Sequence, residues 1–312
     1  MEKHKSVLMQ ESIEYLNLKE DGTYVDCTLG FGGHSSEILK RIKRGKLFAF
    51  DQDMQAVNYS QERLGQIGSN FEIIHCNFSK MKEELLDRGV TQVDGILFDL
   101  GVSSPQLDDK SRGFSYQADA FLDMRMNQDQ SLTAYQVVNE YSYHDLLTIF
   151  YNYGEEKYAK NIASNIVKAR ETRNIETTLE LVDIIYNSVP EKYKRGKHPA
   201  RKIFQAIRIE VNKELEILEQ ALLDAISMLA PGGRLCVITF HSLEDRICKQ
   251  LFKKMSMIDE RVRGLPEIPK EYQPELVLVQ RKAITPNKKE LEENHRARSA
   301  KLRVVEKNKK DV

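Results

Sequence analysis

Glycines and carboxylates that could hold a cofactor stand at the ends of β-forming runs. Three glycines, Gly30, Gly32 and Gly33, occur within four positions after the run at 24–29. Glycine lets the backbone turn sharply and lets a ligand lie against it. The apolar spacing over 35–44 predicts a helix, whose N-terminus favours an anionic group. Gly-x-Gly-Gly differs from the Gly-x-Gly-x-x-Gly dinucleotide pattern, so a tight turn without a ligand stays an alternative.

An acid follows at the end of the next expected strand. The apolar run at 46–50 ends in Asp51, about 20 residues after the first glycine. At this place such folds hold a ribose through its hydroxyls. NAD and S-adenosylmethionine (SAM) both carry that ribose, so oxidoreductases and methyltransferases both stay open.

Three further side chains follow expected strands and should lie at the same edge, since ligands bind beyond the carboxyl ends of a doubly wound sheet. Asp99 stands between an apolar run and a Gly-Ser loop, and we expect it to be functional. Phe78 either touches a flat bound ring or belongs to the core. His241 either receives a proton or is a hydrogen-bonded structural histidine.

The elements that must position these residues form a seven-stranded α/β sheet with an insertion. The expected strands are 24–29, 46–50, 71–75, 93–99, 234–240, 275–279 and 301–305, the last two as an antiparallel edge pair. Helices without a buried strand are expected at 131–139, 143–151, 157–171 and 179–188, and one long helix from 207 to 229. This pattern predicts a discontinuous domain of residues 1–107 and 206–312, and a helical substrate-recognition insertion at 108–205.

Charge is balanced overall and uneven locally. The 312 residues hold 47 Lys+Arg and 47 Asp+Glu, which argues against a generic nucleic-acid coat. Residues 192–202 hold six basic side chains and no acid, and residues 281–312 hold 11 basic and five acidic ones. These stretches predict contact with phosphates, with solvated basic loops as the alternative.

Membrane and metal classes are not expected. No apolar run approaches about 18 residues, and the charged N-terminus does not resemble a signal peptide, so we expect a cytoplasmic protein. The four cysteines lack Cys-x-x-Cys spacing, which predicts buried reduced thiols and no metal site.

Seven motifs follow one another along the chain: HKSVL, DCTLGFGGHS, FDLGVSSPQLD, RGFSY with DMRM, HPARKIFQAIRIEVN, PGGRLCVITFHSLEDR and NHRARSAKLR. In this order they resemble the RsmH (MraW) family, which methylates N4 of a decoding-centre cytosine in bacterial 16S ribosomal RNA. The resemblance spans nearly the whole chain. It implies a class I SAM-dependent methyltransferase fold (Rossmann-like, with a helical insertion domain), SAM as cofactor, and cytosine 1402 in the usual rRNA numbering as the target.

The resemblance also implies particular residues. It implies SAM contacts at Gly32, Gly33, His34, Asp51, Phe78, Asp99 and Gln106. With the basic stretches, it implies contact with 16S rRNA in the small ribosomal subunit through Lys197, Arg201, Arg246, Arg296 and Arg298. The chain departs from the family pattern at Phe121, where a proline is usual, and at Lys160-Asn161, where an arginine pair is usual, so details of RNA contact stay open.

This chemistry requires alignment more than a strong base. The sulfonium of SAM is a good leaving group, so the protein must hold acceptor, methyl and sulfur in line. Acceptors at the cytosine N4 amine would take up charge as it forms, and Asp99 is our candidate, with His241 as a later proton acceptor. The alternatives are another nucleic-acid substrate, an NAD-dependent oxidoreductase, or an RNA-binding module without activity.

Overall fold

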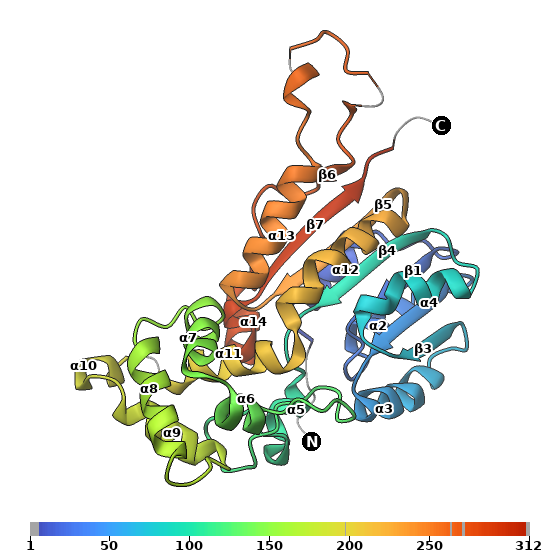
Figure 1. The fold of residues 1–312 in the computed structure, drawn as a ribbon. Helices are drawn as coiled ribbons and strands as arrows, with labels where there is room; N and C mark the ends of the chain where they lie inside the picture. The colour runs from blue at the N-terminus through green and yellow to red at the C-terminus, as the bar shows by residue number, and fades with distance from the viewer. Residues whose placement is uncertain (1–5, 197, 263, 270–271, 310–312) are drawn as a thin grey trace. The chain divides into compact units, whose positions relative to one another are not determined.

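The protein is described by a computed structural model that covers residues 6–196, 198–262, 264–269 and 272–309. The chain divides into two compact units (Figure 1): residues 1–101 with 216–312, and residues 102–215. In the described part of the chain, no helix has both the length and the apolar character that crossing a membrane requires.

The first unit contains the expected seven-stranded sheet, in the order β3-β2-β1-β4-β5-β7-β6 (Figure 1). Its strands are β1 (Thr23–Asp26), β2 (Lys46–Asp51), β3 (Phe71–His75), β4 (Val93–Asp99), β5 (Leu229–Thr239), β6 (Leu276–Leu278) and β7 (Lys301–Lys307). The first five run parallel, and β7 pairs antiparallel with both β5 and β6. The strand order reverses between β1 and β4, and at such a switch point the carboxyl ends of neighbouring strands leave room for a ligand.

Helices of the first unit pack into two apolar cores against the sheet. Its helices are α1 (Met9–Tyr15), α2 (Gly33–Leu39), α3 (Met54–Gly65), α4 (Met81–Asp87), α12 (Glu214–Met228), α13 (Ser242–Met255) and α14 (Lys288–Glu293). One core joins side chains of α4, α12 and α13 to the strands, and the other joins those of α1, α2 and α3. The fully buried Phe50 and Phe98 belong to the first core, and Tyr24 to the second.

The prediction of one long helix from 207 to 229 is wrong. Lys213 adopts φ 55° and ψ 29°, so α11 (Ala200–Asn212) ends there and α12 begins as a separate helix. Apolar residues keep helical spacing on both sides of Lys213, which is why periodicity hides the break. The expected fifth strand also begins earlier, at Leu229, because Leu229 pairs with Val93 and a register shift between Val93 and Gly95 accommodates the extra residues.

The second unit is helical, with its own core. Its helices are α5 (Ser104–Asp108), α6 (Ala134–Glu140), α7 (Tyr143–Asn152), α8 (Ala159–Arg170), α9 (Thr178–Asn187), α10 (Glu191–Lys194) and α11. Capping boxes begin three of them, through the pairs Thr133/Gln136, Ser142/Asp145 and Thr177/Glu180. Each pair satisfies backbone N–H groups that a helix start leaves without partners.

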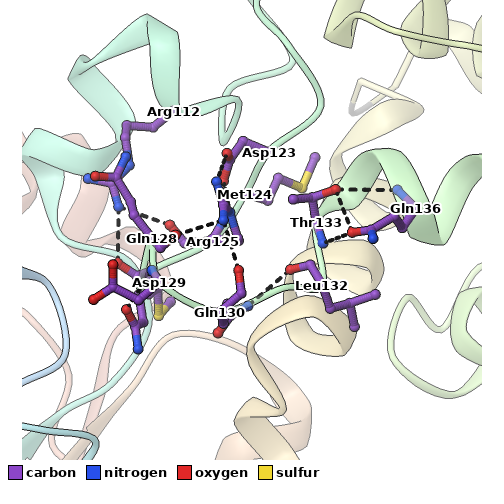
Figure 2. Close-up of polar contacts among 12 residues, drawn as sticks. Arg112, Asp123, Met124, Arg125, Gln128, Asp129, Gln130, Leu132, Thr133 and Gln136 are labelled. Carbon is purple, nitrogen blue, oxygen red and sulfur yellow. Dashed lines mark hydrogen bonds and ion pairs between the residues drawn. The ribbon is translucent and has the colours of Figure 1, made fainter.

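An irregular segment before α6 is held by two arginines (Figure 2). The Arg125 guanidinium pairs with Asp123 and donates hydrogen bonds to the carbonyls of Gln128 and Gln130, at 2.7 and 2.8 Å. The Nη2 of the buried Arg112 donates to the carbonyls of Arg125 and Met126, at 2.9 and 3.1 Å. These carbonyls have no helix or sheet to bond with, so the arginines give the segment a defined shape.

Candidate cofactor-binding and catalytic site

The glycine turn lies between β1 and α2 in backbone that favours glycine. Gly30 has φ 49° and Gly32 has φ 70°. The Gly30 N–H donates to Asp51 Oδ2 at 2.7 Å, and the Gly32 N–H donates to the Leu29 carbonyl at 2.8 Å. The turn is therefore tied to the end of β2, and a side chain at either glycine would be strained.

Asp51 is partly buried and well held. Its Oδ2 accepts from Gly30, and its Oδ1 accepts from the Asp53 N–H at 2.9 Å. Burial raises the pKa of Asp51 to about 6, although both backbone N–H groups favour the carboxylate. Each oxygen keeps a second lone pair, so the carboxylate can still accept from the two hydroxyls of a ribose.

Two residues of α3 hold the turn from its other side, and sequence reasoning missed both. The Ser60 hydroxyl donates to the Gly30 carbonyl at 2.9 Å, and Arg63 Nη1 donates to the Phe31 carbonyl at 2.8 Å. Ser60 is fully buried, and a polar residue on the inner face of a helix is the signal that could have found it. Thus the carbonyls and the N–H groups of the turn are both anchored.

Asp99 and His34 lie side by side at the ends of β4 and the glycine turn. His34 Nδ1 is 3.6 Å from Asp99 Oδ2. Burial lowers the pKa of His34 to about 4, so its ring is neutral near pH 7. Burial, followed by the charges of Asp26 and Glu244, raises the pKa of Asp99 well above its ordinary range.

One oxygen of Asp99 has no hydrogen-bond partner among the described residues. Its side chain is 24% exposed, yet Oδ1 is buried and no group in the described residues donates a hydrogen bond to it. An unpaired buried oxygen costs stability. An incoming N–H or O–H group would remove that cost, so the arrangement is suited to accept a donor from a ligand.

Asp26 is a second carboxylate that sequence reasoning did not single out. It is 1% exposed at the end of β1, where its Oδ2 accepts from the Ser35 hydroxyl at 2.6 Å and its Oδ1 accepts from the Thr28 N–H at 3.1 Å. Burial raises its pKa. An acid inside an otherwise apolar strand was the available signal. Asp26 joins the start of α2 to the turn.

His241 is placed as a helix cap. It is the N-cap of α13, its Nδ1 accepts from the Glu244 N–H at 3.5 Å, and its side chain is 8% exposed. Glu244 Oε2 accepts in return from the N–H groups of Phe240 and His241, at 2.8 and 3.3 Å. This geometry favours the structural alternative, and the role of His241 as a proton acceptor stays a prediction.

The remaining expected cofactor residues have different surroundings. Phe78 begins a short 3-10 helix after β3 and packs edge-on against Phe98, with ring centroids 5.5 Å apart, while staying half-buried. Gly33 begins α2, beside the turn. Gln106 belongs to the second unit, where its Oε1 accepts from the Ser103 N–H at 3.0 Å. The first unit alone therefore brings together the turn, His34, Asp51 and Asp99.

The expected RNA-binding residues are exposed where they are described. Arg201 lies on α11 of the second unit, whereas Arg246 lies on α13 of the first. Arg296 and Arg298 belong to a 3-10 helix, His295–Ser299, in the first unit. All four side chains are solvent-exposed. Lys197 lies outside the described residues.

Comparison with known proteins identifies relatives along the whole chain. A sequence model described as the MraW methylase family matches residues 1–308. The ribosomal RNA small subunit methyltransferase H of Exiguobacterium sibiricum is 58% identical over 310 residues, which cover 99% of each chain.

The solved structures that match this chain are more distant in sequence. An rRNA methylase from Streptococcus thermophilus has a TM-score of 0.43 and 15% identity, with 99% of each chain covered. A SAM-dependent O-methyltransferase from Thermotoga maritima has a TM-score of 0.42 and 10% identity, with 99% of this chain and 68% of that chain covered.

Proposed function

The chain belongs to the MraW methylase family, whose members depend on SAM, and from this premise we propose that it methylates small-subunit ribosomal RNA. More closely, we propose that it transfers a methyl group to the exocyclic N4 of a decoding-centre cytosine of 16S rRNA, cytosine 1402 in the usual numbering. The substrate would place the enzyme in the cytoplasm, where small subunits assemble. Membership of a methylase family removes the oxidoreductase alternative.

The observation that carries this proposal is the buried Oδ1 of Asp99, which lacks a donor within the described residues. It lies at the switch point of the sheet, at the carboxyl end of β4 and beside the turn between β1 and α2. The residues present fit SAM, because the turn is anchored from both sides and Asp51 keeps acceptor capacity for a ribose. When bound, SAM supplies a methyl group on a sulfonium.

Holding the cofactor falls to the turn, Asp51 and Phe78 in this proposal. Gly32 allows the turn at its positive φ, Gly33 leaves room for Ser6 beside the turn, and Asp51 accepts from ribose hydroxyls. Phe78, half-buried against Phe98, offers an apolar face for the adenine ring. His34 stays neutral because of its burial, so it adds no positive charge beside the sulfonium.

Asp99 is proposed to act on the target amine. The lone pair of the cytosine N4 is delocalised into the ring, so the amine must become tetrahedral and positive as it attacks. A carboxylate that accepts one of its N–H groups favours this change and takes up the developing charge. Burial raises the pKa of Asp99, and an N–H donor at Oδ1 opposes that shift by favouring the carboxylate form that this role requires.

The reaction is tested with methyl-labelled SAM and small ribosomal subunits isolated from cells that lack this modification. Nuclease digestion and mass spectrometry should find the label in N4-methylcytidine at one decoding-centre position. Protein-free 16S rRNA and an unrelated DNA serve as further substrates in the same assay. Label in a different nucleoside, or only in DNA, would refute the proposed substrate, and absence of turnover with SAM bound would favour the RNA-binding module.

Arg63→Met is expected to weaken SAM binding about three- to tenfold, because one hydrogen bond to the turn is lost. Calorimetric titration with S-adenosylhomocysteine (SAH) measures this loss. Arg41→Met is the matched control, since Arg41 also donates to a backbone carbonyl, that of Glu37 at 2.8 Å, on the exposed side of α2. Equal affinity of the two variants would contradict the anchoring role of Arg63.

Arg298→Glu is expected to lower the affinity for the small subunit about tenfold and to leave SAH affinity unchanged. Reversing an exposed charge removes a phosphate contact and adds repulsion, so the slope of log affinity against log salt should also become shallower. Lys43→Glu, which reverses an exposed charge outside the basic stretches of the first unit, is the matched control. Salt-independent binding by the unaltered protein would rule out a phosphate-contacting surface.

A further inference from the structure

The N-terminal segment at residues 6–8 lies directly against the glycine turn. A Cβ atom placed on Gly33 would overlap Ser6 Oγ and lie 3.2 Å from Ser6 Cβ. The backbone of Val7 forms a hydrogen bond with the His34 ring. This bond raises the pKa of His34, although burial lowers that pKa by more. Val7 is 6% exposed and Leu8 is fully buried. Ser6 and Val7 therefore pack against Gly33 and His34, the first two residues of α2.

Leu8, the next residue, has an unusual backbone conformation that sets the positions of Ser6 and Val7. It has φ 50° and ψ 36°, the left-handed region that a leucine rarely adopts. Its carbonyl accepts from the Ser12 N–H at 2.9 Å, where α1 begins. Some interaction must offset the cost of that conformation, since a relaxed Leu8 would carry Ser6 and Val7 away from the turn.

The offsetting contact comes from the opposite end of the chain. The Leu8 N–H donates to Glu290 Oε1 at 2.7 Å, across 282 positions of sequence. Glu290 is itself fixed on α14, because its own N–H donates to Asn287 Oδ1 at 2.9 Å. This fixed acceptor oxygen can therefore offset part of the cost of the Leu8 conformation.

We propose that Glu290 is a positioning residue for the cofactor turn, which it orders by holding Leu8 and thereby Ser6 and Val7 against Gly33 and His34. All of these residues belong to the first unit. The inference rests on the proposed function, since it takes the glycine turn as the place where SAM binds.

Three substitutions of Glu290 separate the acceptor oxygen from charge and length. Glu290→Gln keeps an oxygen at the same reach, so it should bind SAH as the unaltered protein does. Glu290→Asp keeps the charge but is one methylene shorter, and Glu290→Ala has no acceptor, so both should bind SAH about fivefold more weakly. Glu292→Ala, an exposed acid on the same helix, is the matched control.

Hydrogen exchange followed by mass spectrometry reports the coupling without any ligand. In Glu290→Asp and Glu290→Ala, peptides that cover residues 6–16 and 28–36 should exchange faster, while a peptide from β5 keeps its protection. A uniform rise across the unit would mean general destabilisation and would overturn the proposal, as would unchanged exchange and affinity in both variants. Failure of the unaltered protein to bind SAH would instead refute the proposed function, which the Glu290 variants do not test.

Discussion

Asp99→Asn is expected to lower kcat about a hundredfold while SAH affinity stays within about threefold. Asparagine has the same shape and keeps an acceptor oxygen, but it lacks the negative charge that takes up the charge developing on the amine. The comparison of kcat from single-turnover methylation with Kd from titration therefore isolates charge from shape. Normal turnover would remove Asp99 from the chemistry, and a large loss of SAH affinity would assign it to the cofactor instead.

The same substitution should make the ligand-free protein more stable at pH 8. The folded-state pKa of Asp99 is raised, so the unfolded chain releases the proton first as the pH increases. The free energy of unfolding therefore falls as the pH rises from the ordinary carboxyl range through the raised pKa. Asparagine does not titrate, so its free energy of unfolding does not fall in this way. Asp99→Asn should therefore be more stable than the unaltered protein at pH 8 but not at pH 4, which chemical denaturation at both pH values measures.

Asp245→Asn is the control with the opposite sign. Burial alone would raise the pKa of Asp245, but hydrogen bonds from Arg303 and Lys301, at 2.7 and 2.9 Å, hold it below its ordinary value. Its stabilising contribution is present above the ordinary carboxyl pKa and is lost as the pH falls through the lowered one. Asp245→Asn should therefore destabilise the protein at pH 8. Equal effects of the two substitutions would mean that neither acts through its proton.

Local pattern was enough to predict the residues that end strands. Asp51 and Asp99 each end a strand as expected, and the carboxyl ends of parallel strands meet at one edge whatever the details of packing. The first strand is shorter than the expected 24–29, because β1 ends at Asp26 and the turn begins before Gly30. His241 was predicted at the right place but with two open roles, because capping and proton transfer require the same residue type after a strand. The capping box with Glu244 appears only when both side chains are placed.

Contacts that depend on distant pairing could not be predicted in this way. The Leu8–Glu290 hydrogen bond joins two segments that are far apart in the sequence, and the apolar periodicity of each segment does not indicate that they meet. Arg63 lies on an ordinary amphipathic helix, and its bond to the Phe31 carbonyl follows from the path of the turn. The break at Lys213 was missed because a single left-handed residue leaves the apolar spacing unchanged. In each case the deciding quantity is a backbone conformation, which a one-dimensional pattern does not contain.

The irregular segment of the second unit depends on one glycine as well as on its arginines. Gly113 has φ 71°, and a Cβ there would overlap the Phe121 carbonyl oxygen and lie 3.0 Å from the Asp123 nitrogen. Those neighbours are backbone atoms of a segment in which Arg125 pairs with Asp123 (Figure 2), and the Ala134 N–H at the start of α6 donates to the Asp123 carbonyl at 2.8 Å, so they cannot move aside cheaply. Gly89 has a similar φ of 74°, yet a Cβ there meets no described atom within 4 Å.

Gly113→Ala should therefore destabilise the second unit by about 3 kcal/mol or more, and Gly89→Ala the first unit by about 1 kcal/mol. Exchange protection in α7 and α8 against that in β4 and β5 measures the two effects separately. If the second unit recognises the substrate, as the sequence pattern predicts for the insertion at 108–205, Gly113→Ala should lose methylation of the small subunit while the first unit still binds SAH. If α7 loses its exchange protection but methylation of the small subunit is retained, the second unit is not needed for substrate recognition. The reaction would then require only the sheet and its glycine turn.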